Sequence, residues 1–481
     1  MRCWLPFCLV VAVLSGCTAE GPAEQGREKE AGGAALAARG WEVCGRTAVS
    51  LGSIPSDTVD ESRAMAHLGA GLLFAADDGR AGSELWLSSG SQGTGTHLLT
   101  DLAPGPSSSA PMEFTRVGDR VFFAAEDPVA GRELFVSDGT AQGTRLVKDL
   151  WPGETGSLPR SLFELNGRLY FSAGDPDHGR ELWRSDGTAE GTVLVEDLDP
   201  GEEGTSPGQL TRGGDGALYF VAQLQGGLFT ALMRKDGDAP AVELFRTPSE
   251  RGISSPLVPM GRRLFFIAGG GHGTPVRLMA TAGGRPAVFV ADFGEVYALA
   301  TVGGRLLLSA TLDMHAHDAE LWVSDGSMRG TRRLKDLRSG MEGSEPGGFT
   351  VMGSRLFFTA DDGIHGRELW VSDGTEGGTR LVADLRSGAE GSYPEALTPI
   401  QGHLFFSAER DGEGQEAWVS DGTAQGTVAL DPLAPGLLGS GPRDFQRSGW
   451  DVFFTGDDGI RGRGLWALPF RPDGKCAAPR R

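Results

Sequence analysis

The chain repeats a unit of about 48 residues, and this repeat limits the fold more than any other feature. Each unit carries an apolar triplet ahead of an acidic turn, and successive triplets begin 42–50 residues apart. The nine triplets begin at Leu72, Val121, Leu169, Leu218, Leu264, Leu306, Leu356, Leu404 and Val452. A period of this length is typical of architectures in which each unit buries the apolar face of its neighbour.

The clearest unit, residues 348–388, contains four short stretches that predict β-strands: 349–352, 355–360, 368–372 and 379–385. Asp361-Asp362-Gly363 and Asp373-Gly374 link them and suit tight hairpins. No amphipathic helix is evident. The pattern predicts an all-β fold, a β-propeller of nine four-stranded antiparallel blades.

Two alternatives to nine blades stay open. Repeats four and five lack the Glu-Leu-Trp marker seen at Glu368-Leu369-Trp370. If one of them is not a blade, the ring has eight. A solenoid is the runner-up, but it needs polar caps at its ends, and the sequence has none.

The N-terminus reads as an export signal. Residues 4–14 form an apolar run too short to span a membrane, and Leu14-Ser15-Gly16-Cys17 follows. This tetrapeptide resembles a bacterial lipobox, which implies cleavage before Cys17 and lipid on its sulfur and amine. An ordinary secretory signal with a chance cysteine is the alternative. The expected organisation is a signal peptide (1–16), a flexible tether (17–40), the propeller (41–476) and a tail (477–481).

The two ends of the propeller predict how its ring closes. The ninth unit stops without a fourth strand, and a spare segment at residues 46–51 resembles the fourth strand of other units. This N-terminal segment can therefore supply the outermost strand of the last blade. Cys44 and Cys476 flank the missing connection, and an exported protein meets an oxidising compartment, so we predict a disulfide between them.

The formal charge of −20 disfavours nucleic-acid and anionic-lipid surfaces as partners. Asp361 and Asp362, in an acidic turn, are candidate Ca²⁺ ligands, and His315 and His317 are a candidate metal pair without a third ligand. For both we favour solvated turns and expect no cofactor. The recurrent Ser-Asp-Gly-Thr, as at residues 372–375, is likewise better explained as a turn.

The signature Glu368-Leu369-Trp370-Val371-Ser372-Asp373-Gly374-Thr375 resembles that of the bacterial ELWxxDGT-repeat proteins, with blades similar to kelch repeats. The resemblance implies an exported, lipid-anchored propeller and assigns no chemistry.

We therefore expect a monomeric module at the cell envelope, held by lipid on Cys17, that binds a protein or glycan. Thr18 after the anchor favours the outer membrane. A hydrolase or lyase with a site at the channel mouth is the alternative, although no familiar catalytic motif is present.

Overall fold

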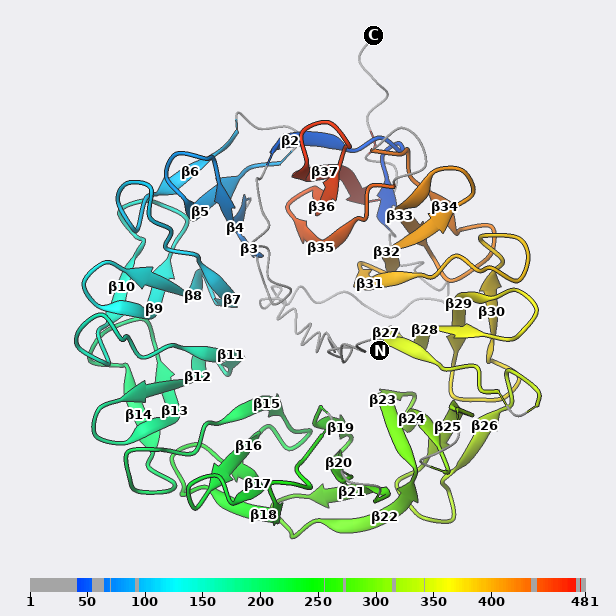
Figure 1. The fold of residues 1–481 in the computed structure, drawn as a ribbon, viewed down its shortest axis with the longest axis horizontal. Coiled ribbons are helices and arrows are strands. Elements are labelled where there is room, and N and C mark those ends of the chain that lie inside the picture. The colour runs from blue at the N-terminus through cyan, green and yellow to red at the C-terminus, as the bar shows by residue number, and fades with distance from the viewer. Residues whose placement is uncertain are drawn as a thin grey trace, which may run out of the picture.

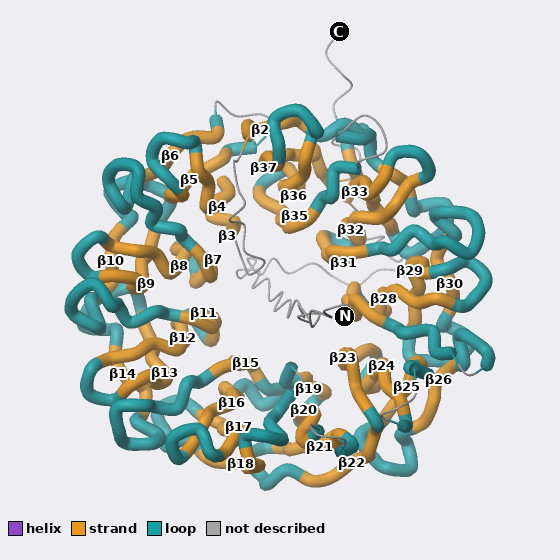
Figure 2. Tube along the Cα trace, viewed as in Figure 1, coloured by secondary structure: helices purple, strands orange, loops and turns teal. Residues whose placement is uncertain are grey.

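A computed structural model describes residues 41–53, 65–69, 71–90, 95–254, 256–270, 274–313, 317–340, 342–433, 439–472 and 476. In this part of the chain there are strands, turns and loops but no helix (Figure 2), and hence none that is long and apolar enough to cross a membrane. Nine antiparallel sheets stand around a central axis like the blades of a propeller (Figure 1).

Eight blades each contain four consecutive strands, ordered from the axis outwards. Blades one to four comprise β3 (Met65–Leu68), β4 (Gly71–Asp77), β5 (Ser83–Ser88), β6 (Thr96–Thr100); β7 (Met112–Val117), β8 (Arg120–Asp127), β9 (Gly131–Ser137), β10 (Arg145–Lys148); β11 (Arg160–Leu165), β12 (Arg168–Asp175), β13 (Gly179–Ser185), β14 (Val193–Glu196); β15 (Gly208–Arg212), β16 (Leu218–Leu224), β17 (Phe229–Lys235) and β18 (Val242–Pro248).

Blades five to eight continue the same order around the ring. They comprise β19 (Val258–Met260), β20 (Arg263–Gly269), β21 (Val276–Ala282), β22 (Val288–Phe293); β23 (Glu295–Val302), β24 (Arg305–Thr311), β25 (Glu320–Ser324), β26 (Arg332–Lys335); β27 (Gly347–Met352), β28 (Arg355–Asp361), β29 (Arg367–Ser372), β30 (Arg380–Ala383); β31 (Glu395–Ile400), β32 (His403–Arg410), β33 (Gly414–Ser420) and β34 (Val428–Ala429).

Blade nine is assembled from both ends of the described chain, and we call it the seam. It contains β35 (Arg443–Ser448), β36 (Asp451–Asp457) and β37 (Arg463–Pro472), with β1 (Trp41–Val43) and β2 (Val49–Ser53) paired to the outer edge of β37. The N-terminal segment thus supplies the outermost strand, as predicted. The pairing of β1 with the far end of β37 was not predicted.

The core lies between neighbouring blades, because the second and third strands bury both of their faces. The apolar triplets supply most of its largest fully buried side chains, for example Phe357 and Phe358 of β28. One apolar cluster joins Phe358 and Trp370 of blade seven to Leu307 and Leu321 of blade six. Burial on both faces explains why these strands read as apolar runs rather than as alternating patterns.

The observed ring corrects three expectations. Repeats four and five are complete four-stranded blades, so the eight-bladed alternative is wrong. The solenoid is also wrong, since Leu72 and Phe74 of blade one pack with Phe453 and Leu465 of the seam. Finally, β30 is shorter than residues 379–385, because Thr379 belongs to the preceding turn, where its hydroxyl bonds to Ser372.

Candidate functional site

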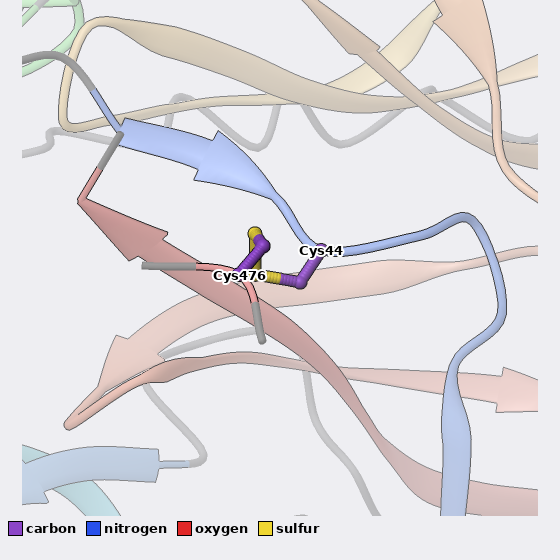
Figure 3. The surroundings of a disulfide bond; sticks show 2 residues. All are labelled: Cys44 and Cys476. Atoms are coloured by element: carbon purple, nitrogen blue, oxygen red, sulfur yellow. A yellow bond between two sulfur atoms is a disulfide. The ribbon is translucent and has the colours of Figure 1, made fainter. Parts of the chain in front are cut away.

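The predicted disulfide joins Cys44 to Cys476 at the seam (Figure 3). The two Cα atoms are 5.3 Å apart, and 432 positions separate the residues in the sequence. The backbone N–H of Cys44 also donates to the carbonyl of Pro469, 2.9 Å away. In the other blades the chain turns at this level, whereas β37 runs on to Pro472 and holds β1 against the ring. The bond therefore replaces a peptide connection between the third and fourth strands.

The Ser-Asp-Gly-Thr segments are turns, as predicted. In blade seven the Asp373 carboxylate accepts hydrogen bonds from the backbone N–H and the hydroxyl of Thr375, at 2.9 and 2.6 Å. These bonds lower the pKa of Asp373. Gly374 has φ +82°, a conformation that favours glycine. Since Asp138, Asp186 and Asp421 bond in the same way, the segment serves the blade.

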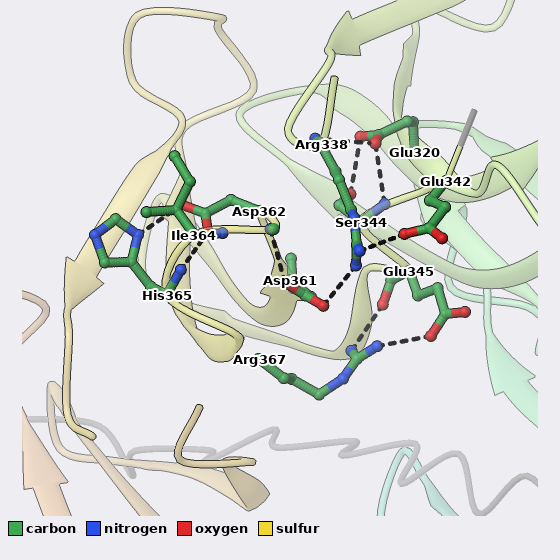
Figure 4. A network of polar contacts seen from close by, with 12 residues as sticks. Glu320, Arg338, Glu342, Ser344, Glu345, Asp361, Asp362, Ile364, His365 and Arg367 are labelled. Atoms are coloured by element: carbon green, nitrogen blue, oxygen red, sulfur yellow. Dashed lines mark hydrogen bonds and ion pairs between the residues drawn. The ribbon is translucent and has the colours of Figure 1, made fainter. Parts of the chain in front are cut away.

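The carboxylates of Asp361 and Asp362 already have protein partners (Figure 4). Asp361 pairs with Arg338 at 2.6 Å, and Asp362 accepts the backbone N–H of Ile364 and of His365. Burial acts to raise the pKa of Asp362, but these bonds and the His365 ring outweigh it and lower the pKa. The arrangement is an Asx turn that uses the carboxylates internally.

His315, one of the predicted metal candidates, lies outside the described residues. The backbone carbonyl of His317 accepts a hydrogen bond from the N–H of Gly343, 2.8 Å away. Within the described ranges, no three His, Cys, Asp or Glu side chains are grouped in a way that could hold a metal ion. Of the candidates that the structure describes, His317, Asp361 and Asp362 are thus not brought together into one metal site.

A buried glutamate on the third strand ties the loop leading to the next blade, and we call this contact the glutamate clamp. Glu320 accepts the Ser344 hydroxyl at 2.8 Å and its backbone N–H at 3.0 Å (Figure 4). Six glutamates make a clamp, and each is 2% exposed or less: Glu84, Glu133, Glu181, Glu320, Glu368 and Glu416.

Burial raises the pKa of Glu133 and of Glu181 to about 7. It also raises the pKa of Glu368 and of Glu416. Perturbed carboxylates often mark catalytic sites, but structural networks perturb them as well. Here the group recurs from blade to blade and is sealed from solvent. It therefore stabilises the blade and gives no support to the enzymatic alternative.

The innermost strands place one residue of each blade at the same level of the ring. Each is the partner of the first residue of an apolar triplet, as Arg116 is of Val121. We call this set the channel ring. Its members are His67, Arg116, Glu164, Arg212, Pro259, Thr301, Val351, Pro399 and Arg447.

The channel ring is basic on one side and mostly apolar on the other. Blades nine, one, two and four contribute Arg447, His67, Arg116 and Arg212, with the acidic Glu164 of blade three among them. Blades five to eight contribute two prolines, a threonine and a valine. The turn motifs recur from blade to blade, but these side chains do not. Variation on a repeated scaffold is what a binding site requires.

The basic residues lie close enough to interact across blades. The His67 ring nitrogen Nδ1 is 3.0 Å from the hydroxyl of Ser448, next to Arg447. Burial lowers the pKa of His67, and the charges of Arg116 and Arg447 lower it further. The side of the ring formed by blades nine, one and two therefore carries a local positive potential within an acidic protein.

The arginines of the channel ring keep donors that are free for a ligand. Nε of Arg116 donates to the carbonyl of Gly118 at 2.8 Å, and the Arg447 guanidinium lies 4.2 Å from the centre of the Trp41 ring. Among the described residues, the terminal nitrogens of Arg116, Arg212 and Arg447 have no hydrogen-bond acceptor. Guanidinium groups in this state suit carboxylate or phosphate groups.

Sequence reasoning did not identify the channel ring, although a signal was present. The member residue stands five positions before the apolar triplet, as Arg116 does before Val121, and six before it in repeat four. Comparing this one position across the nine units reveals the basic and apolar halves.

No family model matches this chain, and no curated protein matches it. One similar solved structure comes from a study of two prolyl endopeptidases, with a TM-score of 0.41 at 12% identity over 66% of this chain and 50% of the other. A puromycin hydrolase gives 0.40 at 16% identity over 72% and 58%. The β-propeller domain of the Trilobed protease from Pyrococcus furiosus gives 0.38 at 13% identity over 67% and 97%.

This chain therefore spans half or little more than half of the first two proteins. Likenesses at these TM-scores carry no argument about function.

Proposed function

We propose that this protein is a binding module of the cell envelope, anchored through lipid on Cys17, and that its channel ring receives an acidic segment of a protein partner. The observation that carries the proposal is the division of the channel ring into a basic and an apolar half. The anchor, the outer-membrane location and membership of the ELWxxDGT-repeat proteins stay predictions from the sequence.

A peptide fits this division better than a glycan does. The side chains of a peptide can supply carboxylates to Arg116 and Arg212 and apolar groups to Val351 and Pro399 across the ring. An acidic polysaccharide could pair its carboxylates with the basic half of the channel ring, but its hydroxyl groups would then lie against the apolar half. The rest of the surface, with a formal charge of −20 for the chain, repels an acidic partner and so favours the channel ring as its docking point.

The test is binding of a labelled peptide of Glu, Leu and Pro to the full chain in detergent, with a matched peptide in which Gln replaces Glu. We expect the triple variant Arg116→Gln, Arg212→Gln, Arg447→Gln to weaken binding by about tenfold or more, because three charge-assisted contacts are lost. A control triple variant, Arg285→Gln, Arg329→Gln, Arg332→Gln, removes three exposed charges elsewhere and should bind normally.

Equal binding by both triple variants would overturn the proposal. If polygalacturonate binds through the channel ring and the peptide does not, the partner is a glycan instead.

A further inference from the structure

The contact between blades three and four, which we call the 3/4 joint, differs from the regular joints. At the joints that follow blades five, six and seven, an arginine at the start of the second strand reaches the Ser-Asp-Gly turn of the next blade. Three such hydrogen bonds are made, by Arg263 to the Asp325 carbonyl at 3.3 Å, Arg305 to the Gly374 carbonyl at 2.7 Å and Arg355 to the Asp421 carbonyl at 3.0 Å. Arg168 holds this position in blade three, and it faces Lys235-Asp236-Gly237-Asp238 instead.

The turn of blade four lies farther from Arg168 than the equivalent turns lie from their arginines. At Gly187, Gly326, Gly374 and Gly422, atoms of the preceding blade's arginine lie 2.6–3.3 Å from where a Cβ would stand. At Gly237, the equivalent glycine, no atom of any described residue other than its two chain neighbours lies within 4 Å of that position. Among the described residues, the Arg168 guanidinium has no hydrogen bond or ion pair, and its side chain is exposed.

A reciprocal exchange of charge holds the 3/4 joint together without that bond. At two other joints a lysine of the fourth strand donates to a carbonyl of the next blade, as Lys148 does to Thr192 at 3.0 Å and Lys335 to Thr379 at 2.7 Å. Blade three has Glu196 at this position, and blade four has Lys235 where six other blades have serine. The two side chains form an ion pair at 2.8 Å. The ion pair thus joins the two blades in the interior, while the missing arginine contact leaves an opening at the surface of the joint.

The opening is a pocket of about 270 Å³. Arg168, Arg184 and Lys235 bring positive charge to it, and Asp236 and Asp238 bring negative charge. Lys235 is already paired with Glu196, so the two arginines are the cations left for a ligand. Arg184 has a partner in Asp238, 2.5 Å away, yet the Asp238 side chain is 84% exposed. Ion pairs as exposed as this one are weak and easily exchanged. The Asp238 carboxylate therefore stands where an incoming carboxylate could stand.

We infer that the 3/4 joint is a second binding site, separate from the channel ring, which takes a carboxylate on a small polar body. The ligand carboxylate replaces Asp238 on Arg184 and pairs with Arg168, whose guanidinium is unused. An arginine can bind a carboxylate through two parallel hydrogen bonds. In the described part of the chain Asp238 bonds only to Arg184, so the donors of Arg168 are left for the ligand. The volume lies below that of pockets for drug-sized ligands, about 300–1,000 Å³, which limits the ligand to the size of a sugar acid or an amino acid.

The experiment measures binding of galacturonate, of N-acetylalanine and of neutral galactose to the full chain in detergent by calorimetry. We expect one of the two acids to bind and galactose not to bind. Asp238→Asn removes the internal competitor and should tighten binding by about fivefold, whereas Arg168→Gln should weaken it by about tenfold. Arg120→Gln changes the equivalent, exposed arginine of blade two and serves as the matched control.

Thermal melting of each variant establishes that it is folded. If neither acid binds the wild type or Asp238→Asn, or if Arg168→Gln binds as Arg120→Gln does, the inference is wrong. Binding of galacturonate alone identifies a glycan unit as the source of the carboxylate, and binding of N-acetylalanine alone identifies a peptide end. The channel ring variants should bind the acid normally, so this site and the proposed channel function succeed or fail separately.

Discussion

Blades seven and nine have the same arrangement of three inner strands, but their outer edges are held in different ways. In blade seven the chain is continuous, and Glu368 receives the backbone N–H of Arg386 at 3.2 Å and the hydroxyl of Ser392 at 2.6 Å. In the seam the register-equivalent residue is Gly464, so the glutamate clamp is absent there. A disulfide and two added strands hold that blade instead.

The glutamate clamp and the disulfide connect chain segments that differ greatly in their separation along the sequence. A clamp fixes a loop whose two ends already belong to neighbouring blades, so a few hydrogen bonds suffice. The seam must join segments that are 432 positions apart, and bringing such distant segments together costs far more chain entropy. A covalent bond removes that cost from folding because it restricts the unfolded chain.

The largest effect should come from opening the seam. Replacing Cys44 and Cys476 with serine should lower the free energy of unfolding by about 4–5 kcal/mol, because the unfolded chain regains the entropy of a long open loop. Urea denaturation of the wild type and the double variant measures the difference. Reduction of the wild type should reproduce it, and an unchanged midpoint in both tests would contradict the prediction.

Removing a clamp should cost less than opening the seam. Glu368→Ala leaves the buried Ser392 hydroxyl and the Arg386 N–H without their acceptor, at about 3 kcal/mol in total. Urea denaturation again provides the measurement. Glu376→Ala, at an exposed position in the same blade, is the matched control and should change stability by less than about 0.5 kcal/mol. Equal effects of the two substitutions would show that the clamp contributes nothing.

The smallest effect at each measured step is a dependence of stability on pH. The pKa of Glu133 is about 7 in the folded protein, above its ordinary value of 4.5, so the folded state holds this proton more tightly. The resulting stabilisation is complete below pH 4.5 and is lost as the pH rises to about 7. Each such glutamate contributes a slope of at most about 1.4 kcal/mol per pH unit.

Glu133→Gln should make this slope shallower over the same window, since an amide does not titrate. Unfolding free energies at half-unit steps of pH, with the exposed Glu376→Gln as control, provide the measurement. A slope identical to that of the wild type would mean that Glu133 titrates normally.

Most of the fold followed from local pattern. The triplets, the Asp-Gly turns and the period defined the blades, and the placement of Cys44, Cys476 and the spare segment predicted the seam. Repeats four and five were harder because they lack the Glu-Leu-Trp marker, yet Leu232 and Leu278 are fully buried as in other blades. The extension of β37 to Pro472 escaped prediction, because it depends on pairing with β1 from the opposite end of the chain.

The candidate sites could not be found in this way. A turn or a strand depends on residues next to one another, so one unit of sequence contains its signal. The channel ring and the pocket at the 3/4 joint depend on single residues from different units, such as Arg116 with Arg447, or Arg168 with Asp238. Their chemistry exists only where the ring brings them together.

Local patterns in the sequence are sufficient to establish the number of units, the turns within them and the two cysteines that close the ring. Strand register and hairpin chemistry are local, and a repeated local solution can be recognised by comparing its copies. Tertiary structure alone decided which side chains surround the axis and where the contact between two blades was lost. Blades three and four are each well formed, and the pocket arises because Arg168 and the turn at Gly237 no longer meet.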